Sequence, residues 1–284
     1  MEKVKIIECP RDAMQGIKGF IPTEMKVAYI KALLDVGFDS IDFGSFVSPK
    51  AIPQLADTAL VLSKLNWSPE KSKLLAIIAN KRGALEASMF DEIRYLGFPF
   101  SVSETFQQRN TNASMEEALH RVEEIQSICA KQNKELVLYI SMGFGNPYGD
   151  PWNPGVVMSW VEKMIALDIK IISLADTIGV AAPEDISMLF KSLIPSFPGI
   201  EFGAHFHTTP GAWHEKVNAA YLNGCRRFDG AIKGYGGCPM AKDELTGNMP
   251  TENLLSFFEE EKMETGIEQA AFNRSVIASS LIFE

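Results

Sequence analysis

Two histidines separated by one residue, His205 and His207, form the sharpest chemical signal in this sequence. In a β-strand, side chains two residues apart point to the same face, so both imidazoles can face one site. Imidazole is a common metal ligand, and a nearby carboxylate would complete a mixed nitrogen and oxygen site. The alternative is a pair of hydrogen-bonded histidines without a metal. Asp12, which we expect at the same end of the fold, favours the metal site.

Other polar residues follow apolar runs that we predict to be strands. They are Arg11 and Asp12, Asp42, Asp176 and Thr177, and Asn248. A glycine-rich loop, residues 234–239, also holds a thiol, Cys238, among residues that permit close approach of a ligand. Asp12 could instead form a structural ion pair with Arg11, and Asp42 could be a buried carboxylate that holds a loop.

These residues need a scaffold that brings strand ends together, and the chain alternates eight short apolar runs with amphipathic stretches. The predicted strands are 4–9, 39–44, 73–79, 92–96, 135–142, 169–175, 200–206 and 227–232. The predicted helices are 23–36, 53–65, 82–89, 114–132, 154–167, 183–194, 211–223 and 250–262. This order predicts an α/β fold, a (β/α)₈ TIM barrel that forms a single domain over 1–284. A doubly wound open sheet is the main alternative, because periodicity does not settle closure.

Several helix ends carry recognisable signals. Ser114 with Glu117 predicts a capping box, and Pro183 suits the first turn of a helix. Gly37 and Gly224 stand where a helix ends with a glycine. Residues from about 263 to 284 are expected to form a short C-terminal helical addition that packs against the barrel.

The composition excludes several classes of protein. The 284 residues carry a formal charge of −9, so attraction to nucleic acid or to an anionic membrane is not expected. No apolar run approaches the ~20 residues that span a bilayer, and we expect no cleavable leader before the first strand. The four cysteines are scattered, which favours a reducing compartment, and we expect a cytoplasmic enzyme. The GxGxxG, GxxxxGK[ST] and GxSxG motifs of nucleotide-binding proteins and hydrolases are absent.

Six segments in order resemble the 3-hydroxy-3-methylglutaryl-CoA lyases, over roughly residues 4–275. They are PRDAMQ (10–15), SFVSPK (45–50), DTIG (176–179), HFH (205–207), GYGGCP (234–239) and GNMPTE (247–252). Each segment alone is weakly specific, but their order is specific to metal-dependent barrel lyases and synthases. The SFVSPK and GYGGCP segments favour the lyases.

The resemblance implies a divalent cation, Mg²⁺ or Mn²⁺, as cofactor. The positions that match the family's metal ligands are Asp12, His205, His207 and Asn248. Arg11 matches the arginine that faces the thioester oxygen, and Cys238 matches a cysteine that acts in proton transfer. The positions that match substrate contacts are Arg11, Gln15 and Thr177. Asp42 stands where the family usually has Glu, and either Asp42 or His205 could be the catalytic base.

The implied reaction is cleavage of an acyl-CoA substrate, 3-hydroxy-3-methylglutaryl-CoA, into acetyl-CoA and acetoacetate. Thr208 stands where the family has Asp, and residues 143–152 depart from the family pattern, so a lyase for another 3-hydroxyacyl-CoA or a hydroxy acid is an alternative. A condensing synthase and a non-catalytic homologue are further alternatives. Lys50 and Arg109 could anchor the CoA moiety or be ordinary surface charges. Because barrels of this kind often form dimers, a homodimer is a further expectation.

Overall fold

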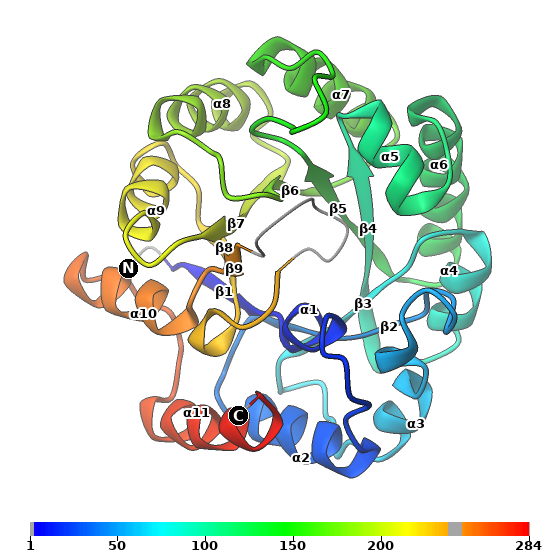
Figure 1. The fold of residues 1–284 in the computed structure, drawn as a ribbon, viewed down its shortest axis with the longest axis vertical. Coiled ribbons are helices and arrows are strands. Elements are labelled where there is room, and N and C mark those ends of the chain that lie inside the picture. The colour runs from blue at the N-terminus through cyan, green and yellow to red at the C-terminus, as the bar shows by residue number, and fades with distance from the viewer. Residues whose placement is uncertain (1–2, 238–245, 284) are drawn as a thin grey trace.

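Eight parallel strands close into a barrel in the computed structural model, which describes residues 3–237 and 246–283 (Figure 1). The strands are β1 (Lys5–Glu8), β2 (Ser40–Ser45), β3 (Lys73–Ile77), β4 (Ile93–Ser101), β5 (Glu135–Ser141), β6 (Ile171–Asp176), β7 (Glu201–Thr208) and β8 (Arg227–Gly230). They pair in the order β6-β5-β4-β3-β2-β1-β8-β7, and β6 also pairs with β7. This last pairing closes the ring, so the predicted (β/α)₈ barrel is confirmed and the open sheet is excluded.

Helices surround the barrel, and each predicted helical stretch contains one. They are α1 (Pro10–Gln15), α2 (Thr23–Leu34), α3 (Thr58–Ser63), α4 (Lys81–Ser88), α5 (Glu104–Thr111), α6 (Met115–Lys131), α7 (Pro154–Ala166), α8 (Pro183–Ser196), α9 (Trp213–Leu222), α10 (Thr251–Glu260) and α11 (Gln269–Phe283). Short 3₁₀ turns lie at η1 (Pro53–Leu55) and η2 (Ile232–Gly234). The short helices α1 and α5 were not predicted, and neither was the two-residue strand β9 (Gly247–Asn248), which pairs antiparallel with β7.

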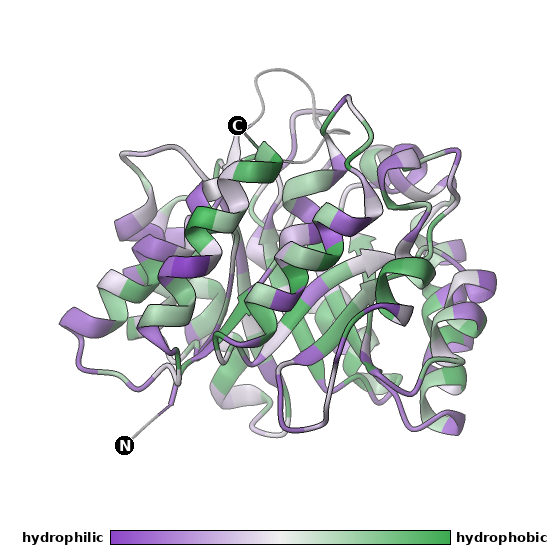
Figure 2. Ribbon diagram, turned by 90° about the horizontal axis from the view of Figure 1, so that it is seen from below, coloured by the Kyte–Doolittle hydropathy of each residue, from purple (hydrophilic) through white to green (hydrophobic). Residues whose placement is uncertain are grey.

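Hydrophobic side chains fill two layers, as expected for strands that are buried on both faces. One layer packs the strands against the helices, and in Figure 2 hydrophobic residues concentrate on the strands while polar residues lie on the outer helix surfaces. A smaller cluster fills the barrel interior: Leu75, Ile77, Tyr95, Val137, Tyr139 and Ile171. The barrel is therefore a packed core whose functional groups must lie at its ends.

The strand β4 is longer than predicted, because it continues through Gly97 and Pro99 to Ser101. Both residue types argue against a strand interior, since glycine has no side chain and proline has no N–H to donate. A Cβ at Gly97 would lie 2.5 Å from Ile77 Cδ1 and 3.0 Å from Leu75 Cδ2. Glycine is thus needed here for interior packing, which a local pattern does not reveal.

The structure confirms each of the predicted helix-end signals. Ser114 and Glu117 form a reciprocal capping box at the start of α6, and Pro183 is the first residue of α8. Gly37 and Gly224 follow α2 and α9 with φ of +94° and +95°, a region that favours glycine. A Cβ at Gly37 would also lie 2.6 Å from the carbonyl oxygen of Gly266.

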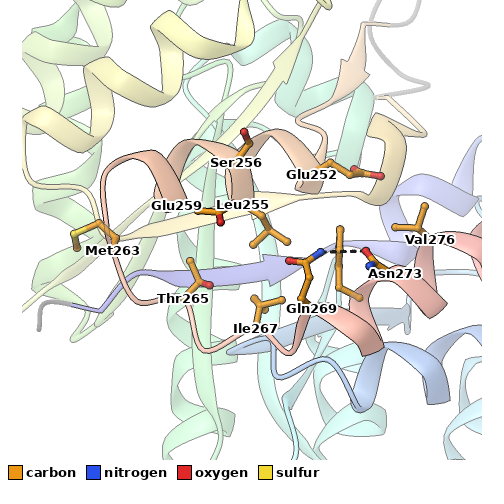
Figure 3. Close-up of a pocket in the computed structure, with 11 residues that line it drawn as sticks. Glu252, Leu255, Ser256, Glu259, Met263, Thr265, Ile267, Gln269, Asn273 and Val276 are labelled. Carbon is orange, nitrogen blue, oxygen red and sulfur yellow. Dashed lines mark hydrogen bonds between the residues drawn. The ribbon is translucent and has the colours of Figure 1, made fainter.

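The predicted C-terminal addition is confirmed as helix α11, which lies beside α2 (Figure 1). The rings of Tyr29 and Phe283 are 6.1 Å apart, and those of Phe38 and Phe272 are 6.4 Å apart. A groove of about 590 Å³ lies between α10 and α11 (Figure 3), and none of the candidate site residues lines it. Within residues 3–237 and 246–283, no helix is long and apolar enough to cross a membrane.

Candidate active site at the carboxyl end of the barrel

The short helix α1 brings two charged residues to the carboxyl end of the barrel directly after β1. Pro10 occupies its first turn, where a missing N–H costs nothing, and Asp12 lies in the same turn, where an acidic side chain is favoured. Arg11 and Asp12 are only 8% and 6% exposed. Both residues therefore lie at the mouth of the barrel, as the sequence predicts.

Strand β7 presents His205 and His207 on one face, as the spacing predicts. Their ring centroids are 5.3 Å apart, and the ligand atoms of Asp12, His205 and His207 all lie within 4.8 Å of one another. Strand β9 places Asn248 opposite His207, where its Nδ2 donates to the carbonyl oxygen of Tyr235 at 2.8 Å and its side chain helps to lower the pKa of Asp12. The structure thus brings together the four residues that were predicted to bind a metal.

The donor atoms of this group fit a divalent cation. Asp12 Oδ1 accepts hydrogen bonds from Arg11 Nη1 at 2.9 Å and from Gln15 Nε2 at 2.6 Å. Asp12 Oδ2 is buried and has no hydrogen-bond partner among the described residues. Burial opposes ionisation of Asp12, but Arg11 and the two histidines lower its pKa below the usual value. An ionised carboxylate with one unpaired oxygen beside two imidazoles is a suitable donor set for such an ion.

Both histidines are oriented by hydrogen bonds to their Nδ1 atoms. His207 Nδ1 lies 3.1 Å from the carbonyl oxygen of Thr246 and therefore donates to it. His205 Nδ1 lies 3.1 Å from Oδ2 of Asp229, which is 3% exposed on β8. These partners assign the proton of each neutral ring to Nδ1 and leave the Nε2 lone pairs for a cation.

The histidine pKa values respond to their surroundings in opposite directions. Burial lowers the pKa of His205, but the hydrogen bond and charge of Asp229 outweigh burial and raise it above its usual value. For His207, burial and the neighbouring His205 together lower the pKa. Asp229 was not among the predicted site residues, because its partner lies 24 residues away on another strand.

Arg11 lies between two carboxylates. Its Nε is 3.0 Å and its Nη2 is 2.5 Å from Asp42 Oδ2, while its Nη1 contacts Asp12 and also donates to Gln15 Oε1 at 2.9 Å. Burial raises the pKa of Asp42 to about 6, although Arg11 acts in the opposite direction. The guanidinium is therefore held rigidly, with its charge shared between Asp12 and Asp42.

Thr177 is buried at the end of β6, and its Oγ1 accepts a hydrogen bond of 2.8 Å from the backbone N–H of Met142 after β5. The neighbouring Asp176 forms a buried ion pair with Lys216, with Nζ 2.6 Å from Oδ2. Lys216 Nζ also donates to the carbonyl oxygen of His207 at 3.0 Å. Lys216 therefore supports the histidine strand, and nothing in its helical sequence context indicates this role.

The remaining predicted residues lie elsewhere. Lys50 and Arg109 are exposed, and the guanidinium of Arg109 lies 4.7 Å from the ring centroid of Tyr148. Asp150, in the segment 143–152, accepts hydrogen bonds from Ser103 and Thr105 and so ties that segment to α5. Cys238 lies outside the described residues.

Fold and site together define a (β/α)₈ barrel with a candidate divalent-cation centre at the carboxyl end of its strands. The HMGL-like family model matches residues 3–276, and the chain belongs to that family. A relative from Danio rerio, 3-hydroxy-3-methylglutaryl-CoA lyase, cytoplasmic, is 33% identical over 93% of this chain and 78% of its own length. A Pseudomonas aeruginosa relative, 3-hydroxy-3-isohexenylglutaryl-CoA/hydroxy-methylglutaryl-CoA lyase, is 32% identical over 95% of this chain and 89% of its own length.

A solved structure has the same fold. It is an HMG-CoA lyase from Acinetobacter baumannii in complex with coenzyme A and 3-methylmalate. The two structures superpose with a TM-score of 0.89 at 32% sequence identity, covering 96% of this chain and 89% of that one. This agreement over nearly the whole chain confirms the family that the six sequence segments indicated.

Proposed function

We propose that this protein is a divalent-cation-dependent carbon–carbon lyase that cleaves 3-hydroxy-3-methylglutaryl-CoA into acetyl-CoA and acetoacetate. The observation that carries the proposal is the position of Asp12 Oδ2, which has no hydrogen-bond partner in residues 3–237 and 246–283, beside His205 and His207, with Arg11 in the same network. The reaction is supported by the family, by the names of the zebrafish and Pseudomonas relatives, and by the ligands of the Acinetobacter neighbour.

The cation would be held by Asp12, His205, His207 and Asn248, and Mg²⁺ and Mn²⁺ are the ions proposed. When bound, such an ion polarises oxygen atoms of the substrate and makes its hydroxyl proton easier to remove. Gln15 supports this arrangement, because its amide contacts both Arg11 and Asp12.

Asp42 is the proposed base that removes the hydroxyl proton. His205 is less suited to this role, because Asp229 engages its Nδ1 and the proposed cation needs its Nε2. Asp42 has a pKa raised to about 6 by burial, so it is ionised at neutral pH and still basic enough to accept a proton.

Cleavage of the carbon–carbon bond leaves negative charge on the thioester oxygen, and Arg11 is the proposed partner for that charge. A single fixed donor of this kind typically contributes about 3–4 kcal/mol to transition-state stabilisation. The proposed proton donor to the enolate carbon is Cys238, since a free thiol with a pKa near ~8.5 is mostly protonated at neutral pH. Thr177 is proposed as a substrate contact at the same mouth.

The test is an acetoacetate-release assay with the metal-stripped full-length protein. Addition of Mn²⁺ or Mg²⁺ should restore activity, EDTA should remove it, and Asp12→Ala should abolish both activity and Mn²⁺ binding. Asp185→Ala, a change in the first turn of α8, serves as a matched control and should leave both intact. Activity of the wild-type protein that persists in excess EDTA would refute cation dependence.

A second candidate substrate is a larger 3-hydroxyacyl-CoA, because the Pseudomonas relative is named for an isohexenyl compound as well. Comparison of kcat/KM for the methyl and isohexenyl substrates distinguishes the two. We also propose that residues 1–284 act as one catalytic domain, that the protein forms a homodimer, and that it works in the cytoplasm. Analytical ultracentrifugation and localisation of a tagged protein test the last two points.

A further inference from the structure

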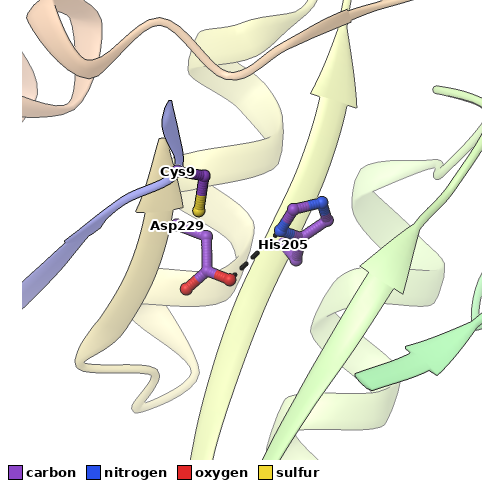
Figure 4. Close-up of side chains that lie close together, drawn as sticks. All are labelled: Cys9, His205 and Asp229. Carbon is purple, nitrogen blue, oxygen red and sulfur yellow. Dashed lines mark hydrogen bonds and ion pairs between the residues drawn. The ribbon is translucent and has the colours of Figure 1, made fainter. Parts of the chain in front are cut away.

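A second group of potential metal ligands lies at the Nδ1 edge of the His205 ring. Cys9, at the end of β1, and Asp229, on β8, approach the Nδ1 edge of His205, and the ligand atoms of the three residues lie within 4.8 Å of one another (Figure 4). Cys9 is 1% exposed and its thiol is free, while Asp229 is 3% exposed. No step of the proposed reaction uses the Cys9 thiol.

The spacing of these atoms suits a tetrahedral ion. Zinc binds imidazole nitrogen and carboxylate oxygen at roughly 2.0–2.2 Å, so two such ligands on one tetrahedral ion lie about 3.3 Å apart. His205 Nδ1 and Asp229 Oδ2 are already 3.1 Å apart. The second oxygen, Asp229 Oδ1, is buried without a hydrogen-bond partner in the described part of the chain, which leaves it available as a ligand.

We propose that Cys9, His205 and Asp229 form a separate binding site for a soft divalent cation such as Zn²⁺, and that occupation of this site inhibits the enzyme. The thiol sets the selectivity, because thiolate prefers Zn²⁺ to Mg²⁺ or Mn²⁺, which favour oxygen ligands. The inhibition, but not the binding, rests on the function proposed above.

The two sites exclude each other through the single proton of the neutral His205 ring. In the structure that proton is assigned to Nδ1, facing Asp229, which leaves the Nε2 lone pair for the cation proposed beside Asp12 and His207. A cation on Nδ1 needs the lone pair there, so the ring proton must move to Nε2, which then cannot bind the catalytic cation. The Cys9 thiol also loses its proton to solvent, and binding therefore releases one proton overall.

Burial keeps the Cys9 thiol neutral until a cation arrives. Desolvation, followed by the nearby carboxylates Asp229, Asp42 and Asp12, raises the pKa of this thiol well above its usual value. A bound divalent cation reverses this effect, since it stabilises the thiolate directly. The site should therefore bind thiophilic ions, and their affinity should rise with pH because binding releases a proton.

Cobalt spectroscopy on the metal-stripped full-length protein tests the binding. Excess Co²⁺ added to Asp12→Ala, which lacks a ligand of the competing site, should produce thiolate-to-cobalt charge-transfer absorption in the near ultraviolet. Addition of Cys9→Ser to this variant should abolish the band, whereas addition of Cys238→Ser should retain it. Absence of the band from Asp12→Ala, or its survival after Cys9→Ser, would overturn the proposed site. This measurement needs no catalytic activity, so it stands apart from the proposed lyase function.

The inhibition is tested with Mn²⁺-loaded protein in the acetoacetate assay. Zn²⁺ should inhibit the wild-type protein and displace Mn²⁺, and EDTA followed by Mn²⁺ should restore activity. Cys9→Ser should retain Mn²⁺-supported activity within about threefold, while the Zn²⁺ concentration that halves activity rises at least tenfold. Equal sensitivity of the two proteins to Zn²⁺ would show that zinc acts by simple replacement of Mn²⁺, and the proposal would fail.

Discussion

Replacement of Glu8 by Gln is expected to stabilise the protein at alkaline pH but not at acidic pH. Glu8 lies on β1 and is fully buried. Its Oε1 accepts a hydrogen bond of 2.9 Å from the backbone N–H of Ile232, and a 2.6 Å hydrogen bond joins Oε2 to Thr251 Oγ1. Burial raises the pKa of Glu8 from its usual 4.5 to about 8, although these two hydrogen bonds act in the opposite direction.

The magnitude follows from the difference in proton affinity between the folded and unfolded states. Above pH 4.5 the unfolded chain releases the Glu8 proton, while the folded protein keeps it up to about pH 8. The folded state therefore binds more protons in this window, and its free energy of unfolding falls as pH rises. Each tenfold difference in proton affinity corresponds to about 1.4 kcal/mol, so the free energy of unfolding should fall by roughly 3–5 kcal/mol by pH 9. Gln keeps both hydrogen bonds without a titrating proton, so this loss disappears.

The assay is urea denaturation at pH 5 and at pH 9, in EDTA so that cation binding does not contribute. The free energies of unfolding of the wild type and Glu8→Gln should differ by less than about 1 kcal/mol at pH 5. At pH 9 the free energy of unfolding of Glu8→Gln should be higher by roughly 3–5 kcal/mol. Glu123→Gln, on the exposed face of α6, is the matched control and should not alter the pH dependence. If Glu8→Gln destabilises the protein equally at both pH values, Glu8 is ionised in the folded state and the reasoning is wrong.

Three further predictions concern the site. Asp229→Asn should lower Mn²⁺ affinity about 10- to 100-fold, because it removes the carboxylate that orients His205. Isothermal titration measures this affinity, and an unchanged value would contradict the role of Asp229. Lys216→Met should reduce the free energy of unfolding by about 3–5 kcal/mol in urea, because it leaves the buried Asp176 carboxylate without its cation; a loss below ~1 kcal/mol would argue against the pair. Asp42→Asn should lower kcat about 10²- to 10⁴-fold with little change in KM, whereas Asp42→Glu should retain most activity. In the wild type, kcat/KM should fall as pH drops below about 6, where Asp42 takes up its proton, and a flat profile from pH 5 to 8 would exclude Asp42 as the base.

The sequence predicted the barrel and the residues at its mouth because both depend on short-range patterns. Buried strands show as apolar runs, and the carboxyl ends of parallel strands meet at one end of a barrel, so the residues that follow them must be neighbours. The spacing of His205 and His207 placed both rings on one face for the same reason. The elements that were missed, α1, α5 and β9, are too short to show a period.

The residues that orient the site were not predicted, because their roles depend on register between distant strands. Asp229 faces His205 only because the two residues are paired across β7 and β8. Lys216 reaches the His207 carbonyl from a helix whose sequence reads as an ordinary amphipathic surface. Cys9, too, looks like a simple apolar strand residue until the structure brings it to the His205 ring.

The charge balance of the barrel mouth would give the proposed cation a second role, in substrate binding. Three buried carboxylates, Asp12, Asp42 and Asp229, lie near one buried guanidinium group, that of Arg11, so with ionised carboxylates and neutral histidines the group carries two net negative charges. A divalent cation would neutralise this charge. In a protein with a formal charge of −9, that neutralisation would remove the local repulsion that an anionic acyl-CoA meets at this site. Cation removal should therefore weaken substrate binding as well as turnover, because the carboxylates would then repel the anionic substrate.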